Sequence, residues 1–521
     1  MLFSSFFFVL VFLPASLLIY FGCCKISPKA GLWALLGLSS IFYAWGNAVF
    51  LILIYFSILF NYYAAKIIQK SNNKSLFGLF IGANVALLLF FKYSSFLIEN
   101  INALFALHIP SPDIPLPLAI SFLTFHQIWF LVGTYRRRLE TPFHEFRPPL
   151  GEAPSLLEFA NYITFFPHLI AGPIVRHTDY FPQLGHSSVY SLSLKNTMVG
   201  ATIFVVGLFK KTVLADSAGL IADPVFGMLA QGASPNMIEA WMGVFSYSFQ
   251  IYFDFSGYSD MAIGLARMFN IFLPCNFLSP YQSESFIEFW RRWHISLSTF
   301  LKEHIYIPLG GNRKGPVRRY ANLFVTMLIG GLWHGASWTF VAWGALHGIF
   351  LALNHLLRAM IKTPLIQNAF LKRVFVFLCV SMIWIFFRAG TFSEAARLLH
   401  SLFDPSGFGL PAHLVKSIDH VLGVSLPHLK ISFSIAKDGF NLNIFTLVSL
   451  FFITFFLPNV YEWMAYFRPA KYFVKSQWAK SRMFKRICWK PTLAYGILIL
   501  LLFSIAFGNI DSRNEFIYFR F

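Results

Sequence analysis

The sequence predicts an all-α protein that crosses a membrane many times, and three features support this fold class. Hydrophobic residues make up 57% of the 521 residues and charged residues only 12%, whereas a soluble domain is closer to half apolar and a quarter charged. Apolar runs of about 20 residues, the length that spans a bilayer, recur along the whole chain. Lys and Arg gather between these runs, as they do in the cytoplasmic loops of membrane proteins.

Ten apolar runs are long enough to be spans, and together with embedded segments near 156–175 and 321–353 they predict a bundle of about 11 spans. The first run has no basic residue before it and no small-residue cleavage site behind it, so we expect it to be the first span and not a removed signal peptide. The ten runs lie near residues 5–24, 31–45, 48–66, 76–98, 116–134, 195–215, 241–265, 371–387, 441–460 and 491–507.

The distribution of basic residues predicts the orientation of these spans. The formal net charge is +19, and the stretches 100–118 and 216–240 contain neither Lys nor Arg. By the positive-inside rule the amino terminus is expected outside and the basic loops in the cytoplasm. Because the basic residues flank spans and form no single stripe, binding of nucleic acid is not predicted. The expected cytoplasmic loops lie at 25–29, 66–74, 136–147, 267–320 and 466–490.

The chain is predicted to form a single membrane domain over residues 1–521, with its core between about 115 and 390. No internal repeat and no long linker separates soluble parts. Residues 389–440 carry both signs of charge and several Pro and Gly turns, so they are expected to form an external loop. The five cysteines show neither a metal-binding spacing nor a disulfide framework, and no metal site is predicted.

Two segments inside the core region are expected to carry special geometry. Apolar and aromatic residues recur at helical spacing between Phe286 and Phe300, which predicts one interfacial amphipathic helix with Arg291 on its polar side. Residues 321–353 are flanked by basic residues at both ends, so the chain is expected to enter the membrane and return as two short helices that break near "WHGAS". A single long tilted helix also fits, at the cost of one violation of the charge rule.

Histidines inside membrane segments are functional candidates, because ionisable groups cost roughly 2.5 to 3.5 kcal/mol each at the centre of a spanning helix. His334 lies in "GGLWHGASWTFVAWGALHG" beside Trp333, where a catalytic imidazole is favoured over one that only joins two helices. His347 in the same stretch is more typical of a structural histidine. His294 borders the aromatic side of the 286–300 helix, and the local sequence does not decide between a catalytic and a structural role for it.

Other polar residues in the apolar segments are weaker candidates for a substrate channel or for support of the site. Asp254 and Asp260 interrupt an apolar run, with Tyr252, Tyr258 and Arg267 close enough in sequence to pair with them. Paired helix contacts are favoured over substrate contacts for these carboxylates. Further supporting candidates are Trp290, Trp293 and Arg291 around His294.

Proton transfer is the chemistry that these residues support best. The sequence contains no phosphate-binding loop, no dinucleotide-binding glycine motif, no HExxH and no nucleophile elbow. A histidine can accept the proton of a hydroxyl that attacks an activated acyl group. The same embedded His and Asp residues also fit a proton-coupled transporter, which is a different class of protein.

Long motifs resemble the membrane-bound O-acyltransferase (MBOAT) family, in particular its alginate O-acetyltransferase membrane-subunit branch. They are "EFWRRWHISLSTFLKEHIYIPLGGNRKG", followed by "LIGGLWHGASWTFVAWGALHG", with further similarity in "FFPHLIAGPIVRH", "YSFQIYFDFSGYSDMAIGLARMF" and "EFIYFRF". The resemblance covers nearly the whole chain. It places the family's invariant histidine at His334 and the second active-site position, often Asn in lipid- or protein-acylating members, at His294. The related D-alanyl branch lacks the "YIPLGGNRKG" stretch.

The resemblance implies a bacterial inner-membrane acetyltransferase whose helices form a funnel around His334. Its donor would be cytoplasmic acetyl-coenzyme A or a carrier-bound acetyl group, with no bound cofactor, and its partners would be membrane lipids and a periplasmic acetyltransferase. The product would be an O-acetylated exopolysaccharide, alginate-like, or a cell-wall polymer. A lipid, peptidoglycan or D-alanyl acyltransferase of the same family is the alternative, and an acyl-enzyme and direct transfer both fit.

Overall fold

The computed structural model describes residues 1–46, 48–71, 73–139, 154–361, 366–405, 440–473, 487–510 and 516–517. These residues form helices and no β-strand, which confirms the all-α fold class. Each of the ten predicted apolar runs falls on a helical region. Five helical segments within the described ranges are long and apolar enough to cross a membrane: Val49–Lys70, Lys74–Phe105, Leu194–Ala230, Trp338–Met360 and Ala369–Arg388. The protein is therefore a multi-pass membrane protein, and the count of about 11 spans stays a prediction.

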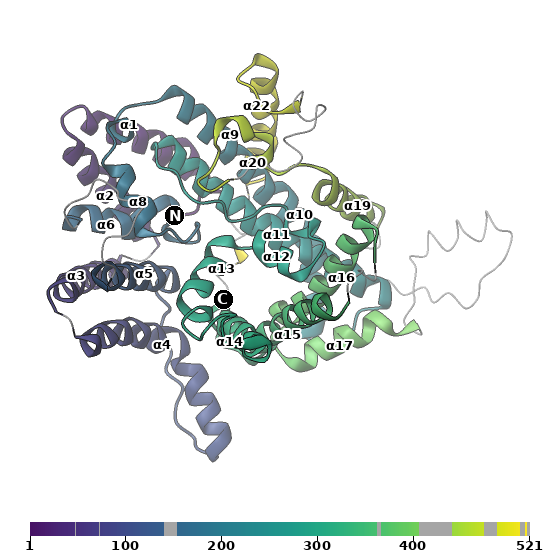
Figure 1. Cartoon of the computed structure of the whole chain (residues 1–521). Helices are drawn as coiled ribbons and strands as arrows, with labels where there is room; N and C mark the ends of the chain where they lie inside the picture. Colours follow the sequence, from purple (N-terminus) through teal and green to yellow (C-terminus); the bar gives the residue numbers. More distant parts are fainter. Residues whose placement is uncertain are drawn as a thin grey trace.

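The first third of the chain forms a group of helices on one side of the molecule (Figure 1). α2 packs on α1 and α6, and α5 lies between α3 and α4. Asn61 and Asn84 exchange side-chain hydrogen bonds of 3.1 and 2.8 Å between α3 and α4. The elements are η1 (Phe8–Phe12), α1 (Leu13–Cys24), α2 (Pro28–Ala44), α3 (Val49–Lys70), α4 (Lys74–Phe105), α5 (Ile120–Leu139), α6 (Leu156–Thr164), α7 (Phe166–Leu169), α8 (His177–Leu184) and η2 (Ser187–Tyr190).

The centre of the fold is α11 (Met237–Met268), which is buried along nearly its whole length. It packs closely on α9 (Leu194–Phe209), because a methyl group at Gly200 would lie 2.5 Å from the carbonyl oxygen of Gly264. α9 continues through the π-helix η3 (Lys210–Ala215) into α10 (Asp216–Ala230). The stretch 216–240, expected from its lack of basic residues to separate two spans, is therefore helical as far as Ala230.

The remaining helices include those that carry the candidate site. Figure 1 shows α12 to α16 curving from the centre toward α17 and α19. The expected external loop at 389–440 begins with a helix, α17, and its residues 406–439 lie outside the described ranges. The elements are η4 (Pro280–Gln282), α12 (Phe286–Arg292), α13 (Ile295–Leu301), η5 (Lys302–Tyr306), α14 (Gly315–His334), α15 (Trp338–Met360), α16 (Ala369–Arg388), α17 (Phe392–Phe403), α19 (Phe440–Phe456), α20 (Val460–Trp463), η7 (Ala465–Phe467) and α22 (Leu493–Gly508).

Candidate active site

His334 is the last residue of α14, and the chain turns back into α15 four residues later. The two helices pack so closely that a methyl group at Gly331 would lie 2.3 Å from the carbonyl oxygen of Phe340. The predicted break at "WHGAS" is therefore correct, and a single long helix is excluded. The expectation of short helices was wrong, since the 20 and 23 residues of α14 and α15 are each about the length of a span.

Aromatic rings surround the His334 imidazole. The ring centroids of Trp333, Trp343 and Phe387 lie 4.9, 5.1 and 5.1 Å from that of His334, each in an edge-on arrangement. Packing against these rings fixes the orientation of the imidazole. Only 4% of His334 is exposed, so a reaction at this ring would proceed away from bulk water.

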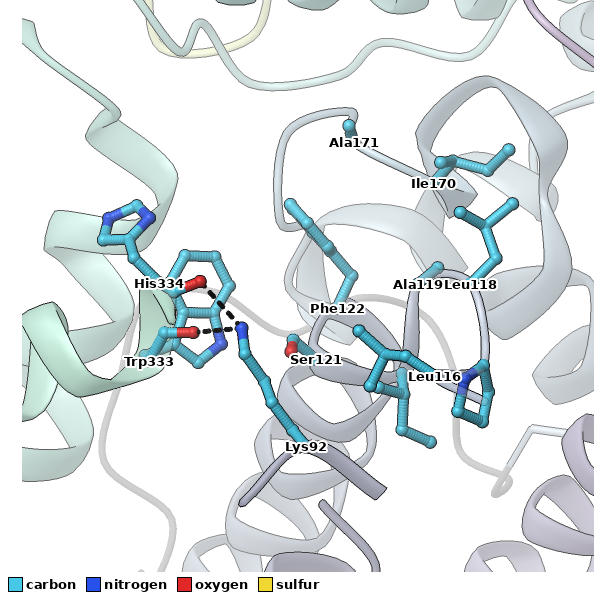
Figure 2. Close-up of a pocket in the computed structure, with 12 residues that line it drawn as sticks. Lys92, Leu116, Leu118, Ala119, Ser121, Phe122, Ile170, Ala171, Trp333 and His334 are labelled. Carbon is cyan, nitrogen blue, oxygen red and sulfur yellow. Dashed lines mark hydrogen bonds between the residues drawn. The ribbon is translucent and has the colours of Figure 1, made fainter. Parts of the chain in front are cut away.

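A cavity of about 150 Å³ opens beside this histidine. Figure 2 shows His334 and Trp333 on one side of it and the start of α5 on the other, with Lys92 of α4 below. At 1.5 Å per residue, His334 lies about 24 Å along α14 from Arg318, the first arginine of that helix. The other residues that line the cavity are Leu116, Pro117, Leu118, Ala119, Ile120, Ser121, Phe122, Ile170 and Ala171.

His294 occupies a break between two helices. A continuous helix over 286–300 was predicted, but α12 ends at Arg292 and α13 begins at Ile295. His294 itself has left-handed backbone angles, φ 42° and ψ 55°. The reason is Asn276, whose carbonyl oxygen accepts the Ile295 N–H at 3.0 Å and whose side-chain oxygen accepts the Ser296 N–H at 3.2 Å. These bonds replace the helical ones and turn His294 into the interior, where it is fully buried.

The break brings the two histidines together. The ring centroids of His294 and His334 lie 6.4 Å apart. His294 Nδ1 lies 3.2 Å from the Asn276 side-chain oxygen, while its Nε2 has no hydrogen-bond partner among the described residues. This pair can hold and move a proton next to the cavity, which is what general acid-base chemistry at a hydroxyl requires.

The supporting candidate His347 lies in the aromatic layer behind the pair. Its Nδ1 accepts the Trp290 indole N–H at 3.3 Å, and its ring contacts Trp343 at 4.8 Å. Trp343 in turn contacts His334, so His347 reaches the candidate base only through an indole. These contacts fit the structural role that the sequence favoured for His347.

The remaining candidates separate into two groups. Trp293 and Tyr252 pack against each other at 6.4 Å, one layer from the histidines. Asp254 pairs with Lys211 at 2.9 Å, and Asp260 with Lys210 at 2.6 Å. The predicted partners Tyr252, Tyr258 and Arg267 were wrong, because the helical continuation through η3 carries both lysines onto the face of α11. Asp254 therefore stabilises the contact between α11 and η3 and lies outside the histidine cluster.

Arg291 lies in a second and larger cavity of about 430 Å³. This cavity is formed by α12, α13, η5 and the halves of α14 and α15 nearest their basic ends. It is lined by Arg291, Lys302 and His355 together with apolar and hydroxyl side chains. Its contacts on α14 are Leu323, Thr326 and Met327, six or more residues before Trp333, so the two cavities lie at different depths along one helix.

Three contributors to this site escaped the sequence interpretation: Lys92, Asn276 and Trp343. Lys92 could have been identified from the sequence, because it is a lone charge in the apolar run 76–98. Ionisable residues inside membrane segments are functional candidates, and the histidines were selected on the same ground. Asn276 and Trp343 carried none, because an amide in a loop and one tryptophan among many are ordinary in such a chain. Within the described ranges no group of three or more His, Cys, Asp and Glu is arranged to hold a metal ion.

Comparisons with known proteins show which family the chain resembles. The sequence profile of the membrane-bound O-acyltransferase family matches residues 69–389. A peptidoglycan O-acetyltransferase of Helicobacter pylori is 41% identical over 81% of this chain and 83% of its own. A probable alginate O-acetylase of Pseudomonas aeruginosa is 38% identical over 78% and 75%. A teichoic acid D-alanyltransferase of Streptococcus thermophilus is 29% identical over 52% and 67%.

The chain belongs to the membrane-bound O-acyltransferase family and is an O-acyltransferase. The region that the family profile matches contains α14, α15 and both histidines of the candidate site. The transporter alternative is thereby set aside. The relatives differ in their named acceptor polymers, so the acceptor has to be argued separately.

Proposed function

We propose that this protein takes an acetyl group from a cytoplasmic thioester donor and passes it across the bacterial inner membrane for O-acetylation of a polymer outside. The observation that carries the proposal is the pairing of His334 with His294 at the wall of the 150 Å³ cavity. Relatives named for O-acetylation of alginate and of peptidoglycan support the acetyl group. Acetyl-coenzyme A or a carrier-bound acetyl group would be the donor.

In this reaction His334 would act as the general base. An acceptor hydroxyl gives its proton to an imidazole nitrogen as its oxygen attacks the acetyl carbonyl carbon. The new C–O bond forms, the C–S bond breaks, and the leaving thiolate takes the proton from the imidazolium. Base catalysis of this kind contributes typically about 10²- to 10⁴-fold to a rate. His294, held by Asn276, would steady the orientation and proton of its partner.

The larger cavity suits the donor side. Arg291 and Lys302 are exposed there, and coenzyme A and phosphopantetheine carriers both present phosphate groups. Cationic side chains at the mouth of an apolar cavity attract such anions and raise their local concentration. The charge pattern supports a cytoplasmic location for this end of α14. The smaller cavity at His334 would then receive the acceptor hydroxyl, presented by a periplasmic acetyltransferase partner.

A cell-wall acceptor is favoured over alginate by the relative from Helicobacter pylori, which is named for peptidoglycan and is more similar to this chain than the probable alginate O-acetylase reported above. We propose peptidoglycan as the first polymer to test and an alginate-like exopolysaccharide as the second. Mass analysis of the acetyl content of each polymer in a deletion strain separates the two. Loss of acetyl groups from the exopolysaccharide alone would reverse the order.

The donor step can be tested on the purified protein in nanodiscs. With acetyl-coenzyme A we expect release of free thiol by the wild type, and release at least about 10²-fold slower by His334→Ala and slowed by His294→Ala. His168→Ala, which removes a buried histidine outside the site, is the matched control and should keep its rate per folded molecule. Thiol release at the wild-type rate by His334→Ala would overturn the role of this histidine. A requirement for the periplasmic protein would show that it is the acceptor.

A further inference from the structure

The end of α14 that carries His334 is held by one neighbouring helix, α4. The Lys92 ammonium donates to the carbonyl oxygens of Trp333 at 2.6 Å and His334 at 2.9 Å. The next residue, Tyr93, donates its hydroxyl to the carbonyl oxygen of Leu332 at 2.5 Å. Two adjacent side chains of α4 thus satisfy three consecutive carbonyl groups. Figure 2 shows the two Lys92 bonds at the edge of the cavity.

These carbonyl groups need partners from outside their own helix. The last four carbonyl groups of a helix have no amide four residues ahead to bond with, and here the chain leaves the helix at Gly335. In a membrane interior no bulk water replaces those bonds. A cation is also favoured at this end, because the helix dipole is negative there. Without Lys92 and Tyr93, the turn that positions His334 would be open to fraying.

The same face of α4 also holds the far side of the break. The Trp338 indole N–H, at the first residue of α15, donates to the Asn100 side-chain oxygen at 2.8 Å. Phe96 packs against the same indole at 5.8 Å. Residues 92, 93, 96 and 100 lie one to two turns apart, so a single stripe of α4 contacts the chain on both sides of "HGAS".

Lys92 is unusual among the lysines of the apolar segments. Lys210 and Lys211 each pair with an Asp at 2.6 to 2.9 Å, whereas no carboxylate lies within ion-pair distance of Lys92 among the residues that the structure describes. An unpaired charge in such a segment is costly. Lys92 lines the cavity and donates its hydrogen bonds to the backbone beside the candidate base, with its ammonium also 5.9 Å from the centroid of the Trp333 ring.

We propose that Lys92 is a positioning residue for acyl transfer, and that Lys92 and Tyr93 together fix the final turn of α14 and thereby the position of the His334 imidazole beside the cavity. This inference rests on the proposed role of His334 as the base. Lys92 acts through the backbone of residues 333 and 334 and needs no contact with the acyl group. Its removal should therefore slow the chemical step more than it weakens donor binding, since the donor cavity is lined by other residues.

Steady-state thiol release from acetyl-coenzyme A by the nanodisc protein, with the periplasmic acetyltransferase supplied as the acetyl acceptor, tests the proposal. We expect Lys92→Met to lower kcat by about 10- to 100-fold with KM for acetyl-coenzyme A changed by less than about threefold, because a small misplacement of a catalytic group has effects of this size. Lys92→Arg keeps the charge and the donors and should restore kcat to within about fivefold of the wild type. Lys74→Met, at the exposed start of the same helix, is the matched control and should leave both constants unchanged.

Tyr93→Phe provides a second and milder variant that removes one donor and keeps the ring. We expect a kcat about two- to tenfold lower, again at constant KM. If Lys92→Met fails to reach the membrane, Tyr93→Phe tests the positioning role in its place. Wild-type kcat in Lys92→Met, or in Tyr93→Phe where only that variant folds, would overturn the inference, as would equal losses in Lys92→Met and Lys92→Arg. Wild-type activity of His334→Gln in the same assay would instead overturn the proposed function.

Discussion

Two pairs of buried histidines with neighbouring rings stand out among the described residues, and one of them has the surroundings of an active site. The rings of His126 and His168 stack with centroids 4.9 Å apart, while those of His294 and His334 are 6.4 Å apart. His126 uses both nitrogen atoms, with Nδ1 at 2.8 Å from the Phe122 carbonyl oxygen and Nε2 accepting the Val175 N–H at 3.0 Å. His168 Nε2 bonds to the Tyr162 carbonyl oxygen at 2.9 Å.

The two pairs differ in their access to a cavity. His126 and His168 join segments of backbone, and neither lines the two cavities described above. His334 lines a cavity, and the Nε2 of its neighbour His294 has no hydrogen-bond partner in the described part of the chain. Burial of an imidazole in an apolar segment is therefore a poor guide by itself. Because His168 Nδ1 also has no hydrogen-bond partner among the described residues, access to a cavity is what separates a candidate base from a structural histidine here.

The strongest test of this comparison changes one histidine of each pair. We expect His334→Gln to lower the rate of acyl transfer by about 10²- to 10⁴-fold with little change in melting temperature. His168→Leu should behave oppositely, because the Tyr162 carbonyl loses its donor and the protein loses about 1 to 3 kcal/mol of stability. Thiol release and melting in detergent measure the two effects. A His168→Leu protein that folds normally but fails to react would place the active site elsewhere.

The sequence predicted the backbone around His334 correctly and the backbone around His294 incorrectly. "WHGAS" gave the break after α14, because glycine and a polar residue between two apolar runs favour a turn. The similar pattern around His294 gave a wrong continuous helix, since helical spacing of Phe286, Trp290 and Phe300 cannot reveal that Asn276, far back in the chain, caps the residues after the break. The periodicity of apolar residues reports a local preference for helix, and the hydrogen bonds to Asn276 outweigh that preference at His294.

The ionic contacts show the same limit. Intramembrane charge identified Asp254 and Asp260 as residues that need partners. Their partners were sought within a few turns of the same helix, but they are Lys210 and Lys211 on a neighbouring π-helix. Pairing across helices depends on rotation about the helix axis, which η3 changes by its wider turn. The need for a partner was therefore readable from the sequence, and the identity of the partner was not.

The second test separates the backbone of His294 from its imidazole. Asn adopts the left-handed conformation more readily than most residues, whereas Ala is strained there by about 1 to 2 kcal/mol. We expect His294→Asn and His294→Ala both to slow acyl transfer, by about 10- to 100-fold, while only His294→Ala lowers the melting temperature. Equal rates for His294→Asn and the wild type would show that a hydrogen-bonding side chain in this backbone conformation suffices, and that the imidazole of His294 carries no proton.

The smallest expected effect concerns the aromatic layer behind the active pair. Trp290→Phe removes the indole N–H that His347 Nδ1 accepts at 3.3 Å and keeps most of the ring packing. Loss of one such bond typically costs about 1 kcal/mol, so we expect a slightly lower melting temperature and acyl transfer within about threefold of the wild type. His347→Leu should lower stability in the same way, and the double variant should show less than the sum of the two losses, because both single changes break one bond. A large loss of rate in His347→Leu at unchanged stability would move His347 from the structural group to the reacting pair, since its ring would then have to act on His334 through Trp343.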